Sequence, residues 1–245
     1  MNRRDFITLL GAAAAWPLVA RAQKQPMPVV GFLHVASAEP NTNVVVGFRQ
    51  GLRDTGFIDG QNVAIDFRWA EGRYDRLPAL AADLVRRQVA VIFAAGGSAP
   101  AQAAKAATDK IPIVFSSGGD PIAGGLVASL SRPGGNITGV SLMFSDLVAK
   151  RLGLLHELVP NAALMGALVN PDYADVDLQR KQLQEAARAL MLELQIESAR
   201  TEREISTAFE VIVQRGGSAV LVTNDPFLAA QRHQIIALAA RHVIP

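Results

Sequence analysis

The feature that most constrains this chain is an alternation of short β-rich runs with longer amphipathic runs, which begins after Gln23. Val29–Leu33 has the character of a buried strand, and the run 41–55 places Val45, Phe48 and Leu52 on one helical face. The same alternation predicts further strands at 63–67, 89–94, 111–115, 165–169, 192–198 and 219–223, and helices at 77–88, 99–108, 147–159, 176–190, 205–214 and 227–241. Such alternation is typical of βαβ units around a parallel sheet, so the predicted fold class is α/β.

The alternation pauses once, at a Gly/Pro-rich turn followed by the run 137–141. We interpret the pause as a crossover between two doubly wound parallel-sheet lobes. Lobe I is expected at 27–141 and lobe II at 142–245, with a hinge near 138–141. A single larger sheet is the alternative that the pattern leaves open.

The last residues resemble an internal junction of the same chain. His242-Val243-Ile244-Pro245 is similar to Lys110-Ile111-Pro112, where a predicted helix leads into a strand. We therefore expect the C-terminal part of the second lobe to be missing and the natural protein to continue.

The first residues have the three-part layout of a secretory signal peptide. Arg3 and Arg4 precede an apolar stretch, and Ala20-Arg21-Ala22 supplies a small-x-small cleavage pattern. The arginine pair is typical of twin-arginine export. The apolar stretch is shorter than the roughly 20 residues that span a bilayer. We therefore expect residues 1–22 to be removed after Ala22 and the remainder to be periplasmic.

The net charge belongs to this expected signal peptide. The chain has 24 Lys and Arg against 22 Asp and Glu, a net charge of +2. Residues 1–22 carry Arg3, Arg4 and Arg21 against Asp5, which is the same excess, so the remainder is neutral. Nucleic acid and direct membrane binding are therefore not expected as partners. The chain also has no cysteine, which excludes a disulfide framework and a lipid-modified cysteine.

Small and polar residues gather at the predicted strand ends, where parallel sheets bind ligands. Gly97 and Ser98 would let a ligand approach backbone N–H groups at a helix start. Taken singly, Asp120, Asp172 and Asp225 could instead be helix caps or turn formers. The candidate ligand-binding residues at these ends are His34, Ser37, Gly97, Ser98, Asp120, Asn170, Tyr173, Asn224 and Asp225.

Signatures of catalysis and of metal binding are missing from the sequence. Ser98 lacks the second flanking glycine of a nucleophile elbow, and His156-Glu157 is not followed by the second histidine of a zinc helix. No glycine-rich loop has dinucleotide or P-loop spacing. We therefore expect no catalytic residues, no metal and no cofactor, and a protein that is not an enzyme.

In combination, several motifs make the chain resemble the substrate-binding proteins of ABC transporters, in their tryptophan/tyrosine-receptor-like group. The motifs lie at 47–52, 56–63, 111–115, 120–121, 126–141, 170–171 and 223–225. The resemblance implies a type I periplasmic-binding fold that closes on a small solute, with Ser141 also facing the cleft. This sequence departs from the family pattern at His34-Val35 and at Ser98-Ala99-Pro100. We therefore do not assign the ligand of better-known members to this chain.

The resulting expectation is a periplasmic solute-binding component of an ABC importer. It would bind a small organic solute, amino-acid-like or aromatic, by hinge closure, and it would work as a monomer with ABC permease and ATPase subunits. A ligand-sensing protein for a membrane sensor and an enzyme on the same fold are the alternatives left open.

Overall fold

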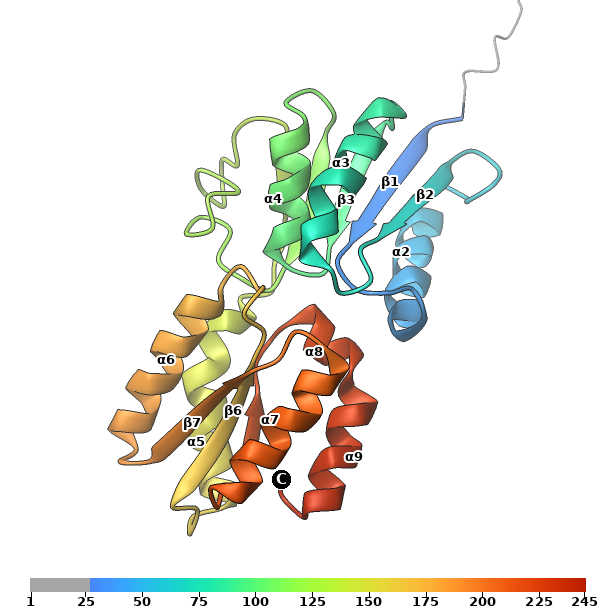
Figure 1. The fold of residues 1–245 in the computed structure, drawn as a ribbon. Coiled ribbons are helices and arrows are strands. Elements are labelled where there is room, and N and C mark those ends of the chain that lie inside the picture. Colours follow the sequence, from blue (N-terminus) through green and yellow to red (C-terminus); the bar gives the residue numbers. More distant parts are fainter. Residues whose placement is uncertain (1–26) are drawn as a thin grey trace, which may run out of the picture.

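Two parallel β-sheets organise residues 27–245, the part of the chain that the computed structural model describes (Figure 1). The expected signal peptide lies outside the described residues. The five-stranded sheet has the order β2-β1-β3-β4-β5 and the three-stranded sheet the order β7-β6-β8. Every strand pair is parallel. The α/β class with two parallel-sheet lobes is confirmed, and the single-sheet alternative is wrong.

The larger lobe consists of the five-stranded sheet and its helices. Its strands are β1 (Val29–His34), β2 (Ala64–Trp69), β3 (Val91–Ala95), β4 (Ile113–Ser117) and β5 (Ile137–Ser141). Its helices are α2 (Thr42–Asp54), α3 (Leu77–Arg86) and α4 (Ser98–Ala107), with 3-10 turns η1 (Glu39–Asn41) and η2 (Tyr74–Arg76). Helices α3 and α4 cover one face of the sheet and α2 lies on the other (Figure 1).

The smaller lobe consists of the three-stranded sheet and five helices. Its strands are β6 (Leu164–Val169), β7 (Glu193–Ser198) and β8 (Val220–Val222). After the 3-10 turn η3 (Phe144–Leu147), its helices are α5 (Val148–Leu158), α6 (Val176–Ala189), α7 (Glu202–Gln214), α8 (Pro226–Ala230) and α9 (Arg232–His242). Apolar residues of α5 and α6 pack on one face of β6, and those of α7 to α9 pack on the other.

An aromatic cluster lies between α2 and the larger sheet. Phe32 is fully buried at its centre, and its ring centroid lies 5.1 to 5.4 Å from those of Phe48, Phe67, Trp69 and Phe93. Aromatic side chains bury large areas and add specific ring contacts. This cluster therefore holds the end of β1, where the chain turns toward the cleft between the lobes.

The segment 138–141, which was expected to be the hinge, is part of the regular edge strand β5. Gly139 pairs with Phe115 of β4, and a side chain at Gly139 would overlap Phe115. The chain leaves the sheet only after Ser141, through Met143 with its left-handed φ of 48°. The connection between the lobes is therefore 142–147.

The helix predicted at 227–241 is two helices. The first, α8, ends at Ala230, and the N–H of the next residue, Gln231, is shared between the carbonyls of Phe227 and Leu228. Helix α9 begins directly afterwards at Arg232. The break places Ala230, Gln231 and Arg232 beside the space between the lobes.

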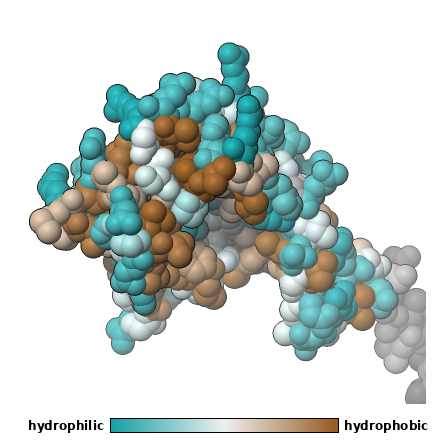
Figure 2. Space-filling view, turned by 90° about the horizontal axis from the view of Figure 1, so that it is seen from below, coloured by the Kyte–Doolittle hydropathy of each residue, from teal (hydrophilic) through white to brown (hydrophobic). Residues whose placement is uncertain are grey.

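The surface at the smaller-lobe end is mixed in character. Figure 2 shows apolar patches separated by polar ones on this side of the molecule. Within residues 27–245, no helix combines the length and the apolar character that crossing a bilayer requires.

Candidate ligand-binding site

A cavity of about 330 Å³ lies where strand ends of the larger sheet meet the smaller lobe. His34, Gly97 and Ser117 line it from the larger lobe. Tyr173, Asn224 and Asp225 line it from the smaller lobe. Polar strand-end groups from both lobes thus converge on one cavity, whose volume is in the size range of small-molecule sites. We call it the inner cavity.

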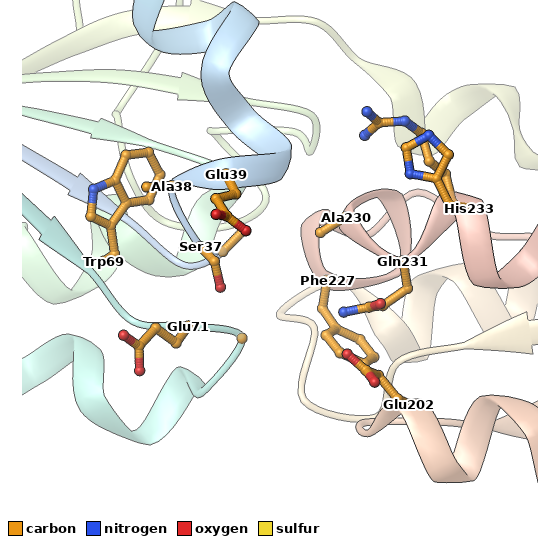
Figure 3. A pocket seen from close by; sticks show the side chains of 13 residues that line it. Ser37, Ala38, Glu39, Trp69, Glu71, Glu202, Phe227, Ala230, Gln231 and His233 are labelled. Atoms are coloured by element: carbon orange, nitrogen blue, oxygen red, sulfur yellow. The ribbon is translucent and has the colours of Figure 1, made fainter.

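A wider cavity of about 840 Å³ adjoins the inner one. Figure 3 shows Ser37, Glu39 and Trp69 of the larger lobe facing Phe227 and Gln231 of the smaller lobe across it. The two cavities share Ala230 and Arg232 in their walls. We call the wider one the outer cavity and place the candidate site in the inner one, because the strand ends converge there.

One hydrogen bond joins the lobes beside the inner cavity. The Tyr74 hydroxyl of η2 donates to Asp225 Oδ2 at 2.6 Å, across 151 positions of sequence. Asp225 Oδ1 accepts the Leu228 N–H at 2.8 Å and so caps the start of α8. Asp225 is therefore both a helix cap, as its position before proline allowed, and a contact between the lobes.

Burial shifts the ionisation of both partners in this bond. It raises the pKa of Asp225, partly offset by the hydrogen bond from Tyr74. It raises the pKa of Tyr74 well above the usual tyrosine value, and the neighbouring charge of Asp225 adds to the effect. Tyr74 is therefore a neutral donor throughout the physiological range.

Side chains of the smaller lobe pack directly against glycines of the larger lobe at four places. A Cβ on Gly72 would lie 3.2 Å from Phe227, and one on Gly97 3.4 Å from Tyr173. The contacts of Gly118 and Gly119 are tighter still. A Cβ on Gly118 would lie 2.6 Å from Asn224 Nδ2, and one on Gly119 would overlap Asp175 Oδ2. The two lobes are thus closely fitted at these loops.

His34 is a neutral, oriented ring in the wall of the inner cavity. It is 3 % exposed, and its Nδ1 accepts the Ala36 N–H at 3.0 Å. Burial lowers the pKa of His34 to about 4. Since Nδ1 is an acceptor, the neutral ring carries its hydrogen on Nε2. His34 is thus a hydrogen-bond donor at its Nε2 without being a charge.

The other candidate residues lie elsewhere. Ser37 borders the outer cavity. Ser98 is buried against Ser117, with 2.9 Å between their hydroxyl oxygens. Three further side chains that were expected at the cleft form hydrogen bonds with nearby backbone instead. Asp120 accepts from the N–H groups of Ile122 and Ala123, Ser141 donates to the Gly119 carbonyl, and Asn170 accepts from the Asp172 N–H. These three fix the shape of the strand ends, because their polar atoms have local partners there.

Several wall residues of the inner cavity were not anticipated. Val44 reaches it from α2, Phe93 from β3, and Leu142 and Phe144 from the connection between the lobes. They add apolar surface to the wall of the cavity. The rule that found the polar residues selects small and polar residues at strand ends, so it passes over these apolar ones.

Metal binding finds no support among residues 27–245. No group of three or more His, Cys, Asp and Glu side chains lies close enough there to hold a metal ion. The polar groups in the wall of the inner cavity are hydroxyls, amides, backbone groups, a neutral imidazole, the Asp225 carboxyl and the Arg232 guanidinium.

The chain is similar to proteins of a known family. A family model described as "ABC transporter substrate binding protein" matches residues 29–245. A tyrosine-binding protein of Clostridioides difficile is 30% identical over 199 residues, which cover 81% of this chain and 56% of the relative. The chain therefore spans about half the length of this curated relative.

Solved structures share the fold. A conserved domain protein from Vibrio cholerae matches with a TM-score of 0.80 and 25% identity, over 89% of this chain and 73% of that one. An ABC domain in complex with L-Trp from Streptococcus pneumonia matches with a TM-score of 0.76 and 24% identity, over 89% and 72% of the two chains. At this identity the second match supports the fold alone.

Proposed function

Because the chain belongs to the family of ABC transporter substrate-binding proteins, we propose that it is the solute-binding component of an importer. It takes a small organic solute into the inner cavity and presents it to a membrane permease that an ATPase drives. The observation that carries this proposal is the convergence of His34, Gly97, Tyr173, Asn224 and Asp225 from both lobes on one cavity. A protein that binds between lobes can couple binding to closure.

The apolar and polar groups in the wall of the inner cavity fit an amino-acid-like or aromatic solute. The ring of such a solute would contact Phe93 and Phe144, and its polar end would meet Asn224, the hydroxyl of Ser117 and the backbone at Gly97. The relative named a tyrosine-binding protein supports this class. Closure would turn the lobes about the connection 142–147, where Met143 has a left-handed backbone.

With this function, the protein would act in the periplasm. The twin-arginine pattern at Arg3 and Arg4 supports export, with cleavage after Ala22. The protein would work there as a monomer, since one chain supplies both walls of the cavity.

A binding screen tests the proposal directly. Isothermal titration of the purified chain with L-tyrosine, L-tryptophan and a panel of aromatic acids is expected to reveal a saturable ligand. The variant Asn224→Ala should weaken that binding by about tenfold or more, because it removes a polar wall group. Asp109→Asn is the control, since Asp109 is exposed and remote from the cavity. Equal binding by Asn224→Ala and wild type, or conversion of the ligand to a product, would contradict the proposal.

A further inference from the structure

The fit between the lobes depends most closely on two adjacent glycines that follow β4. Neither Gly118 nor Gly119 has a left-handed φ, unlike Gly96 and Gly97 after β3. Backbone conformation therefore does not require glycine at either position. What distinguishes the two positions is the space in front of them, which side chains of the smaller lobe occupy.

Gly119 is the tighter of the two positions. A methyl group there would overlap Asp175 Oδ2 and would lie 3.0 Å from Asp175 Cγ. Rotating the carboxylate about its own axis would not clear the methyl group, because Cγ itself is too close. Asp175 Oδ2 is also buried, so the side chain has little free space into which it can turn.

Gly118 is less restrictive. Its added methyl group would meet Asn224 Nδ2 at 2.6 Å but Asn224 Cγ only at 3.7 Å. A turn of the amide would relieve most of this overlap. Phe144 Cδ2, at 3.3 Å, would need a small further adjustment. The two glycines should therefore differ in how strongly they resist substitution.

We propose that Gly119 sets the closed position of the receptor: its missing side chain is the space that Asp175 enters when the lobes meet. The proposal rests on the proposed function, since it concerns the closure that would hold the solute. Gly119 is a positioning residue and does not line the inner cavity. Within its own lobe the added methyl group also meets the buried Ser98 Oγ at 3.0 Å. The overlap with Asp175 Oδ2 is tighter, so the larger part of the cost of substitution is expected in the closed arrangement.

The absence of cysteine makes a direct test possible. Ala106 on α4 and Gln184 on α6 are exposed and belong to different lobes. Spin labels on the double variant Ala106→Cys/Gln184→Cys would report the distance between the lobes by pulsed electron resonance. The distance is measured alone and with saturating L-tyrosine or L-tryptophan, and affinity is measured by titration.

Four backgrounds then isolate the contact. Gly119→Ala is expected to remove the short, closed distance and to weaken binding by about tenfold or more. Asp175→Ala should retain closure, and Gly119→Ala/Asp175→Ala should regain it, because the second change vacates the space that the methyl group needs. Gly153→Ala is the matched control, since nothing lies within 4 Å of Gly153. Unfolding midpoints show that each variant is folded.

The outcomes separate this inference from the proposed function. A Gly119→Ala chain that closes and binds like wild type overturns the inference and leaves the function standing. The inference is also overturned if the double variant Gly119→Ala/Asp175→Ala does not regain closure. A wild-type chain that never shows the short distance, with any solute of the panel, contradicts the proposed function and the inference together.

Discussion

Tyr74 and Asp225 are separated by 151 positions of sequence, yet their side chains form a 2.6 Å hydrogen bond that joins the two lobes. Each partner is fixed within its own lobe. Tyr74 belongs to the turn η2, and Asp225 is held by the Leu228 N–H. The bond therefore reports the relative position of the lobes rather than a local feature of either.

Removing this bond should weaken solute binding without unfolding either lobe. Tyr74→Phe deletes only the hydroxyl and leaves Asp225 Oδ2 buried without its donor. A hydrogen bond to a carboxylate contributes about 1.5–3 kcal/mol, so affinity should fall by roughly tenfold or more. Titration calorimetry measures the effect. Asp109→Asn should bind like wild type, and an unchanged affinity in Tyr74→Phe would show that the bond does not support closure.

The stability of the fold should fall in acid because of His34. Its pKa is about 4 in the folded chain and 6.5 ordinarily, so the unfolded state takes up the proton first. The stabilisation is complete above pH 6.5 and is lost as the pH falls from 6.5 to 4. The loss is of order 3 kcal/mol. Urea unfolding as a function of pH measures it. His34→Asn should flatten this slope, whereas His233→Asn, at an exposed position, should keep it.

Solute binding should tighten as the solution becomes more acidic. Burial raises the pKa of Asp225 and of Asp175 where the lobes meet, so closure favours proton uptake. Asp225 is faced by Tyr74, Asn170 and the N–H groups of Phe227 and Leu228. Asp175 is faced by Tyr173, Ser98 and Asp120. Titrations at several pH values in Asp225→Asn/Asp175→Asn should lose the trend. A trend that survives in this double variant would have another origin.

The aromatic cluster should account for much of the stability of the larger lobe. Phe32→Ala removes the ring at its centre and should cost about 3–5 kcal/mol of unfolding free energy. Phe57, which is 45 % exposed, provides the control, because Phe57→Ala should change stability by about 0.5 kcal/mol or less. Chemical denaturation followed by circular dichroism compares them. Similar losses in the two variants would mean that the cluster is not a special source of stability.

Export should depend on the arginine pair. Arg3→Lys/Arg4→Lys is expected to leave the uncleaved chain in the cytoplasm of a host with a twin-arginine pathway. Arg21→Lys keeps the charge near the cleavage site and should be exported normally. Fractionation and immunoblotting distinguish the two. Export of the double lysine variant would indicate a different route.

Much of the fold was predictable because parallel strands buried on both faces form short, continuous apolar runs. Val29–Leu33 is an example, and β1 extends it by one residue. The start of α7 was predicted late, although Thr201 and Glu204 form a capping pair that marks its true beginning. The break at Gln231 has no comparable signal, since the apolar spacing continues through it.

The site was predictable only in part. The rule that ligands meet the ends of parallel strands found Asn224 and Gly97, which do line the inner cavity. It also selected Asp120 and Ser141, whose side chains are engaged by backbone beside them. Tyr74 and Asp175 face the other lobe because of how the lobes dock, and no local periodicity carries that information.

Each sheet is built from one uninterrupted stretch of chain, 29–141 for the larger and 164–222 for the smaller. The five strands described for the first sheet are therefore synthesised before those of the second sheet begin. Folding can then proceed from the N-terminus in two successive stages of short-range pairing. Contacts between the lobes, with Tyr74 and Asp225 as the example, form last. Such an order would suit the proposed twin-arginine export, a route that carries folded cargo.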